Sequence, residues 1–316
     1  MEIAGKKVLV TGGNGFIGSH LVRSLVSKNI QVIVPFIKID KKSFFNREDL
    51  DKKTVFVGCD LRNYKKTFNL IAKNRIDFIY HLAAQSIVEK ALDNPLETFE
   101  SNIVGTINVL EAARRYGKVS GIIVTSSDKA YGKIPRASES NPVGGDHPYE
   151  TSKSSADLIS RTYFATYKLP VVVTRFGNVY GEGDLNFSRI IPGTLRAIIK
   201  GEKLMIRSNG KFVRDYVHVE DVVNALMVLS KNLKKVSGEA FNISSKENLS
   251  VIALIKKIEK ALEVKINYQI LDSAINEIPK QSIDFSKIRK LGWRPQKNIN
   301  KTIRGIYEWY QSYFGK

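Results

Sequence analysis

Near its beginning the chain reads Lys7-Val8-Leu9-Val10-Thr11-Gly12-Gly13-Asn14-Gly15-Phe16-Ile17-Gly18. The apolar run before the glycines predicts a buried strand, and helical spacing predicts a helix after them, with apolar residues at Leu21, Val22, Leu25 and Val26. Glycines at this turn allow close approach of the backbone to a pyrophosphate and close packing of the helix on the strand. The N–H groups that begin the helix would face the phosphates. Strand, glycine turn and helix in this order predict a dinucleotide site.

Strands and helices alternate beyond this turn. Short apolar runs predict further strands at 31–34, 54–58, 78–82, 122–124 and 171–174, and a strand at 240–243 that we expect to return to the main sheet. Long helices are expected at 97–116 and from Tyr149 onward, and shorter ones at 188–200 and 221–229. This alternation predicts an α/β fold with a Rossmann-type, doubly wound parallel sheet. We expect an NAD(P)-binding domain over 1–176 and a smaller C-terminal α/β lobe that binds the substrate over 177–316.

Chemically active side chains follow the central strand directly. Ser127, Asp128 and Lys129 come after the apolar run, at the carboxyl end where ligands bind in such sheets. Tyr149 and Lys153 are four residues apart and would share one helix face. An ammonium beside a phenol lowers the phenol's pKa from about 10, so this tyrosine could take a proton from a sugar hydroxyl. Alone, the pair is more typical of an ordinary surface helix start, and it favours catalysis only because a dinucleotide site is predicted upstream.

The remaining cofactor contacts are predicted from strand ends. Asp60 follows the third strand and could meet the adenine amine, and small residues after the fourth strand would let the backbone lie against the cofactor. The second strand ends in Pro35-Phe36-Ile37-Lys38, without the acidic residue expected for the NAD ribose and without an arginine for NADP. The glycine turn predicts NAD as the cofactor. Because this strand end does not determine what binds the 2′ position of the ribose, NADP is not excluded. The predicted cofactor-binding residues are Gly12, Asn14, Gly15, Phe16, Ile17, Gly18, Asp60, Leu61, Leu82, Ala83, Ala84, Gln85, Asn102, Thr125, Tyr149, Lys153 and Phe176.

Composition limits the other functional classes. The chain has 316 residues, 43% of them hydrophobic, and a formal net charge of +19. Its lysines are spread between apolar positions, as in Ile255-Lys256-Lys257-Ile258, which favours a solvated surface over a nucleic-acid site. Cys59 is the single cysteine, which fits a reducing cytoplasm, and the four histidines lack metal-ligand spacing. We expect no signal peptide, and no membrane span because no apolar run approaches about 18 residues.

Together, these motifs resemble the extended short-chain dehydrogenase/reductase superfamily over nearly the whole chain. The resemblance depends on Thr11 to Gly18, on Tyr149 with Lys153, and on the segments Arg175 to Gly181 and Lys290 to Trp293. It implies a nucleotide-sugar epimerase or dehydratase with tightly held NAD(P). It also implies a homodimer formed through the helices near 97–116 and 149–167.

Two reactions within this family remain open. Asp128–Lys129, with Gly144 to Tyr149 and Gly177 to Asp184, resembles CDP-glucose 4,6-dehydratases. The segment Asn14 to Gly18 looks more like that of the epimerases, and Ser127 stands where threonine is commoner. The alternatives are thus a 4,6-dehydratase and an NAD-dependent nucleotide-sugar 4-epimerase. The charge alone suggests a non-catalytic nucleotide- or RNA-binding protein, and the intact tyrosine–lysine pair argues against it.

The resemblance implies a role for each candidate residue. Tyr149, activated by Lys153, would deprotonate the sugar C4 hydroxyl while Ser127 hydrogen-bonds the C4 oxygen. Lys129 would act as base at C5, and Asp128 as acid to the departing C6 hydroxyl. Arg189 and Arg214 are candidates for the diphosphate, although structural ion pairing is an alternative for Arg189. The predicted substrate-binding residues are Gln85, Asn178, Arg189, Ile191, Arg207 and Arg214.

Overall fold

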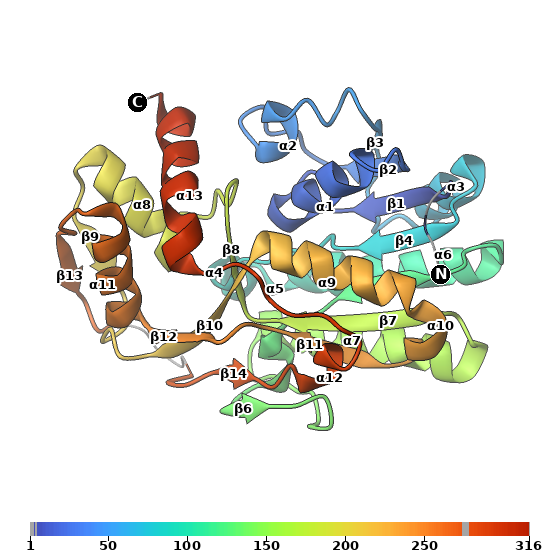
Figure 1. Ribbon diagram of the computed structural model, residues 1–316. Helices are drawn as coiled ribbons and strands as arrows, with labels where there is room; N and C mark the ends of the chain where they lie inside the picture. The colour runs from blue at the N-terminus through green and yellow to red at the C-terminus, as the bar shows by residue number, and fades with distance from the viewer. Residues whose placement is uncertain (1–2, 4, 274–277, 316) are drawn as a thin grey trace.

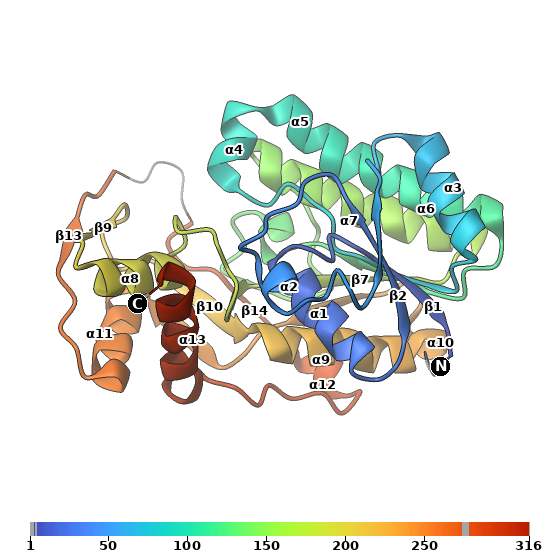
Figure 2. The same cartoon turned by 90° about the horizontal axis from the view of Figure 1, so that it is seen from above.

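The computed structural model describes residue 3 and residues 5–273 and 278–315, which form two lobes side by side (Figures 1 and 2). The larger lobe contains a seven-stranded sheet in the order β11-β7-β5-β4-β1-β2-β3. All of its neighbouring strands pair in parallel. The strands are β1 (Lys7–Thr11), β2 (Gln31–Phe36), β3 (Val55–Gly58), β4 (Phe78–His81), β5 (Ile122–Thr125), β7 (Val171–Phe176) and β11 (Ala240–Ile243). The predicted doubly wound parallel sheet is confirmed.

Helices cover both faces of this sheet (Figure 2). One face carries α1 (Phe16–Val26), α9 (Val219–Lys231), α10 (Leu233–Val236) and α12 (Ser286–Arg289). The other carries α3 (Tyr64–Asn74), α6 (Gly105–Tyr116) and α7 (Pro148–Tyr167). Strands buried on both faces read as continuous apolar runs, which is why they could be recognised in the sequence.

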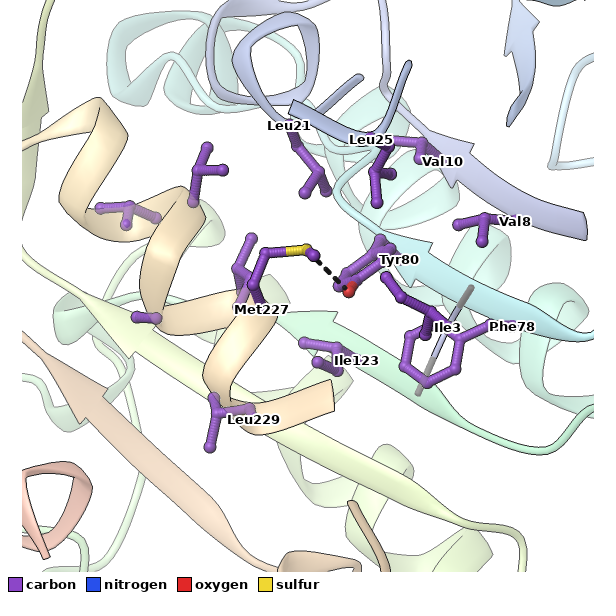
Figure 3. Packing of buried hydrophobic residues seen from close by; sticks show 14 of the residues in the cluster. Ile3, Val8, Val10, Leu21, Leu25, Phe78, Tyr80, Ile123, Met227 and Leu229 are labelled. Atoms are coloured by element: carbon purple, nitrogen blue, oxygen red, sulfur yellow. Dashed lines mark hydrogen bonds between the residues drawn. The ribbon is translucent and has the colours of Figure 1, made fainter. Parts of the chain in front are cut away.

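Figure 3 shows the packing on the α1 and α9 face. Leu21 and Leu25 of α1 lie in one cluster with Tyr80 of β4 and Met227 of α9. The Tyr80 hydroxyl donates to the Met227 sulfur at 3.5 Å, which satisfies a polar atom within an otherwise apolar cluster. Because α9 lies late in the chain, its packing here locks the C-terminal half onto the N-terminal sheet.

A helical segment with an irregular middle precedes β5. It consists of α5 (Pro95–Phe99), a π-helical turn η1 (Glu100–Val104) and then α6, which ends at Gly117 in the left-handed conformation. The predicted helix at 97–116 is present, with a π turn that periodicity alone did not indicate. Such turns occur frequently at functional sites.

The smaller lobe has its own apolar core, in which α8, α11 and α13 pack against short strands (Figure 1). Its elements are β8 (Asn178–Tyr180), α8 (Ile190–Lys200), β9 (Leu204–Ile206), β10 (Val213–His218), β12 (Glu247–Ser250), α11 (Val251–Leu262), β13 (Tyr268–Ile270) and α13 (Ile299–Phe314). The remaining short elements are α2 (Phe44–Arg47), α4 (Val88–Asp93), η2 (Asp128–Tyr131), β6 (Arg136–Ala137) and β14 (Ser282–Ile283). After β10 the chain returns to the larger lobe through α9 and β11. The predicted domain boundary at residue 176 stays a prediction.

None of the described helices is both long and apolar enough to cross a membrane. The described residues also contain no cluster of three or more His, Cys, Asp and Glu side chains arranged to hold a metal ion.

Candidate active site

A cleft of about 1020 Å³ lies along the carboxyl ends of the sheet strands and continues to the smaller lobe. Its wall contains the glycine turn, the residues after β5, the start of α7 and parts of α8, β9 and β10. It contains all five predicted catalytic residues, all six predicted substrate-binding residues, and every predicted cofactor-binding residue except Asn102. The fold therefore brings nearly all the predicted positions to one place.

The glycine turn has no room for side chains. Gly12 has φ +67°, and a Cβ there would lie 2.7 Å from the Ala83 backbone nitrogen. A Cβ on Gly18 would lie 2.1 Å from the Gly12 carbonyl oxygen. The start of α1 thus stays bare toward the cleft, so its N–H groups can meet an anionic group. This backbone cradle fits the pyrophosphate of a dinucleotide.

The end of β2 forms the adjoining wall. Pro35, Phe36, Ile37 and Lys38 line the cleft there, and the Asn14 side chain donates to the Lys38 carbonyl at 2.9 Å. Asp60 also lines the cleft, but its carboxylate accepts from the Arg62 guanidinium at 2.7 Å and from the Arg62 backbone N–H at 3.0 Å. These bonds to Arg62 hold the pKa of Asp60 below its usual value. A carboxylate fixed in this way can still offer a lone pair to an adenine amine.

Asn102 differs from the other predicted cofactor contacts in its position. It lies in the π-helical turn, is 2% exposed and is not part of the cleft wall. Its amide accepts from the Gln85 backbone N–H at 2.7 Å, and it donates to the Gln85 carbonyl and the Ser152 hydroxyl at 2.9 Å. Asn102 therefore ties the loop after β4 to α7, because the irregular turn points its side chain at both.

The residues after β5 form a compact polar group. The Ser127 hydroxyl caps η2 by accepting from the Lys129 backbone N–H at 3.2 Å, and it donates to an Asp128 carboxylate oxygen at 3.0 Å. The Lys129 ammonium lies 3.4 Å from the same Asp128 oxygen. The Asp128 side chain is 4% exposed and that of Lys129 23%. The predicted pair is thus a carboxylate and an amine in contact, with the amine nearer the open cleft.

Tyr149 and Lys153 lie on the first turns of α7, as their spacing predicted. Both are buried in the cleft wall, and the Lys153 ammonium donates to the Thr125 carbonyl at 3.2 Å. Burial raises the pKa of Tyr149 to about 12, opposed by a hydrogen bond with Ser127. Burial lowers the pKa of Lys153 to about 8. The expected lowering of the Tyr149 pKa is therefore wrong for the free protein, because burial outweighs the hydrogen bond with Ser127 and the positive charge of Arg189.

The predicted phosphate-binding arginines already have partners. Arg189 donates to both carboxylate oxygens of Asp184 at 3.0 Å, and Arg207 pairs with Glu89 of α4 across the cleft. Arg214 donates to the Val213 and Ile278 carbonyls at 3.0 and 2.6 Å. The structural ion pair considered for Arg189 is present. A guanidinium has five donors and an ion pair with one carboxylate does not use all of them, so Arg189 and Arg207 can still donate to a phosphate.

The predicted amide and apolar contacts also line the cleft. Asn178 donates to the Asp215 carbonyl at 3.3 Å, as expected of an asparagine that stabilises a turn. Gln85 donates to the Ile87 carbonyl and the Thr98 hydroxyl, each at 3.0 Å. Ile191 is buried.

Several cleft residues were not predicted. They are Arg62, Glu89, His147, Glu150, Asp184, Met205, Phe212, Tyr216 and Gln281. The His147 imidazole lies 3.3 Å from the Glu150 carboxylate, and that i, i+3 spacing on either side of Tyr149 was a usable signal. Gln281 carries no local signal, because a distant segment brings it to the site.

Comparison with known proteins agrees with this geometry. The model of the GDP-mannose 4,6-dehydratase family matches residues 9–306. The dTDP-glucose 4,6-dehydratase 1 of Escherichia coli K12 is 32% identical, over 97% of this chain and 93% of the relative. The crystal structure of a dTDP-glucose 4,6-dehydratase from Streptomyces venezuelae, with NAD bound, has a TM-score of 0.87 and 28% identity, with 98% of each chain covered. That of the UDP-glucuronic acid 4-epimerase of Bacillus cereus, with UDP-glucuronic acid and NAD, has a TM-score of 0.89 and 25% identity over 97% of this chain and 99% of that one.

These findings bear on the predicted class and cofactor. Both structures hold NAD, in agreement with the cofactor expected from the glycine turn. The relatives include dehydratases and an epimerase, the two reactions that the motifs left open. None of these names supports CDP as the nucleotide. Because the family model matches nearly the whole length of the protein, this chain belongs to the GDP-mannose 4,6-dehydratase family.

Proposed function

We propose that the protein is an NAD-dependent nucleotide-sugar 4,6-dehydratase that acts on a nucleoside-diphosphate glucose. The observation that carries the proposal is the contact between Asp128 and Lys129, 3.4 Å apart, in the same cleft wall as Tyr149. Removing water across C5 and C6 needs a base and an acid close together. Epimerisation at C4 needs neither, which is why this pair favours the dehydratase over the epimerase.

Tyr149 takes the proton from the C4 hydroxyl, and Ser127 orients the C4 oxygen. NAD, when bound, supplies a hydride acceptor and a positively charged ring near the phenol. A phenol with a pKa of about 12 is protonated at neutral pH, so Tyr149 becomes a base only when positive charge is placed beside it. Lys153, fixed to the Thr125 carbonyl, contributes part of that charge.

Lys129 and Asp128 divide the elimination between them. Passing one proton from the ammonium to the carboxylate converts the ion pair into a neutral amine and a carboxylic acid, with no change in net charge. The Lys129 amine then removes the C5 proton, and the Asp128 carboxylic acid protonates the departing C6 hydroxyl.

The proposal also asks which nucleotide the substrate carries. Motifs after β5 resemble CDP-glucose 4,6-dehydratases, whereas the curated relative at 32% identity is named for dTDP-glucose. The test is to incubate the NAD-loaded protein with dTDP-, CDP-, UDP- and GDP-glucose and to identify the products by mass. The proposal expects one of them to lose a molecule of water.

Isotopes distinguish the two reactions. Deuterium at C4 of the substrate should reappear at C6, and hydrogen from the solvent should enter at C5. A product with the substrate's mass and inverted C4 would establish the 4-epimerase instead. That second candidate is favoured by the TM-score of 0.89 with the UDP-glucuronic acid 4-epimerase.

Replacing the proposed base tests its role directly. Lys129→Gln should block elimination more than C4 oxidation, so enzyme-bound NADH should accumulate and absorb near-ultraviolet light. Lys133→Gln is the matched control, because Lys133 follows η2, is 72% exposed and pairs with Asp146 outside the catalytic group. Elimination at the normal rate in Lys129→Gln would remove Lys129 from the mechanism.

The proposal includes a homodimer. Exposed apolar side chains gather on α4, α5, η1 and α7, which pack against one another: Leu92, Leu96, Val104 and Leu158. A second copy of the chain would cover this surface, as expected of the helices near 97–116 and 149–167. Light scattering at micromolar concentration should give twice the 35.5 kDa chain mass, and a single chain mass would reject the dimer.

A further inference from the structure

Gln281 lies deep in the wall of the substrate half of the cleft. It belongs to a segment that runs beside β10, where Lys280 forms a bridge with Val213 and the Gln281 backbone N–H donates to the Val213 carbonyl at 3.1 Å. The residue is 3% exposed, although it contributes to the cleft wall. The backbone that carries it is thus held firmly, and its side chain is enclosed next to the ligand space.

The amide nitrogen of Gln281 has no hydrogen-bond partner in the described parts of the chain. The other three cleft amides discussed above are satisfied. Asn14 donates to Lys38, Gln85 to Ile87 and Thr98, and Asn178 to Asp215. Burying an unpaired amide donor is costly, and most buried polar groups have partners. An unpaired donor in a cleft wall therefore indicates an acceptor that arrives with a ligand.

The nearest acidic side chain on β10 is already paired. The carboxylate of Asp215 accepts from Asn248 at 2.6 Å and from Ser244 and the Ile283 backbone N–H at 2.9 Å. Arg214 follows Val213 on the paired strand, and its guanidinium donates to Ile278 of the segment that carries Gln281. Gln281 thus shares the cleft wall with Arg214, the candidate diphosphate contact, and with Asn178, the candidate sugar contact.

We propose that Gln281 is a substrate-binding residue whose Nε2–H donates to an oxygen of the sugar or of the diphosphate. This rests on the proposed function, because it requires the cleft to hold a nucleotide sugar. Both groups carry oxygen acceptors, namely a sugar hydroxyl and a phosphate oxygen. Gln281 fixes the substrate's position and takes no part in proton transfer.

The test is Gln281→Leu, which keeps the size of the side chain and removes the amide. Calorimetry on the NAD-loaded protein should show about tenfold weaker binding of the preferred ligand, with dTDP and dTDP-glucose and, in parallel, CDP and CDP-glucose as probes. Without ligand, the melting temperature should equal or exceed that of the unaltered protein, because the unpaired donor is gone. Gln269→Leu, at an exposed position of β13 outside the cleft wall, is the control and should change no affinity.

The outcomes separate the alternatives. Weaker binding of both nucleoside diphosphate and nucleotide sugar identifies a phosphate oxygen as the acceptor, and weaker binding of the sugar nucleotide alone identifies a sugar hydroxyl. Unchanged affinity for both ligands in Gln281→Leu, or in Gln281→Glu if the leucine variant does not fold, overturns the assignment. A lower melting temperature of Gln281→Leu without any change in affinity shows a structural role and also overturns it. Failure of the unaltered protein to bind any of dTDP-, CDP-, UDP- and GDP-glucose overturns the proposed function and this assignment with it.

Discussion

The two halves of the cleft are built differently. The cofactor half is a surface of backbone and small residues, where Gly12 and Gly18 leave no room for a Cβ. The substrate half consists of long polar side chains that other residues hold, as Asp184 holds Arg189 and Glu89 holds Arg207. A backbone surface depends on its own few residues, and a side-chain surface depends on partners from elsewhere in the chain. Substitutions should therefore act locally in one half and through partners in the other.

The largest effect is expected where the halves meet, at Tyr149. Tyr149→Phe should lower turnover by roughly 10³-fold, within the range of a lost general base, because no other group is placed to take the C4 proton. NAD content and melting temperature should stay nearly unchanged, since only one hydroxyl is removed. Steady-state kinetics with the preferred nucleotide sugar provide the measurement. Activity above a tenth of the normal value would show that the base lies elsewhere.

In the cofactor half, substitution of Gly18 should impair NAD binding. A methyl group at Gly18 would meet the Gly12 carbonyl oxygen at 2.1 Å, so Gly18→Ala must displace the turn, at a cost of about 1–3 kcal/mol. We expect loss of bound NAD, measured by absorbance after release from the denatured protein. Gly305→Ala is the control, because a Cβ there has no neighbour within 4 Å in α13, and it should stabilise the helix by about 0.5–1 kcal/mol. Normal NAD content in Gly18→Ala would contradict the backbone cradle.

The substrate half should respond through its partners. Glu89→Gln removes the charge that holds Arg207 and should tighten binding of the nucleoside diphosphate a few-fold, whereas Arg207→Met should weaken it about tenfold. The pair is about half exposed, so the free energy of unfolding should change by less than about 1 kcal/mol in either variant. Binding calorimetry at two salt concentrations would measure both effects. If Glu89→Gln weakens binding, Glu89 itself contacts the ligand and does not compete with the phosphate for Arg207.

The smallest effect is a change in the pH dependence of stability at Lys153. Burial lowers the pKa of this lysine from 10.5 to about 8, so between these values the unfolded chain binds the extra proton. Below about pH 8 the cost of burying the charged lysine is fully present. From there to pH 10.5 the free energy of unfolding should rise with pH. Lys153→Met should flatten that rise in the cofactor-free protein, as followed by urea unfolding at several pH values. An unchanged slope would mean that Lys153 titrates normally in the fold.

The cofactor half was largely predictable from the sequence. The turn from Gly12 to Gly18 lies between a strand and a helix that local patterns identify, and its shape depends on those residues alone. Tyr149 and Lys153 were found for a similar reason, since helical spacing places them on one face. Asn102 lies outside the cleft wall, because its direction depends on a π turn that residue spacing does not indicate, and its contact with the cofactor stays a prediction.

The substrate half could be predicted only in part. Arg189, Arg207 and Arg214 were recognised as candidates by their chemistry, but their partners Asp184, Glu89 and Ile278 were not. The Glu89 pair in particular follows from how α4 of the larger lobe meets the smaller lobe. The packing of the folded chain also explains why the pKa of Tyr149 differs from the prediction. A lysine four residues from a tyrosine predicts a lowered phenol pKa, and the burial that raises the pKa of Tyr149 to about 12 comes from the packed surroundings.

The sequence by itself determined the parallel sheet, the dinucleotide turn and the reactive residues after β5, because each depends on neighbours within a few positions along the chain. Only the tertiary structure decided which side chains face the substrate and which are already engaged. Gln281 shows the difference, since it comes from a segment far along the chain that pairs beside β10. Its significance depends on burial and on an unsatisfied donor, and both are properties of the folded surroundings.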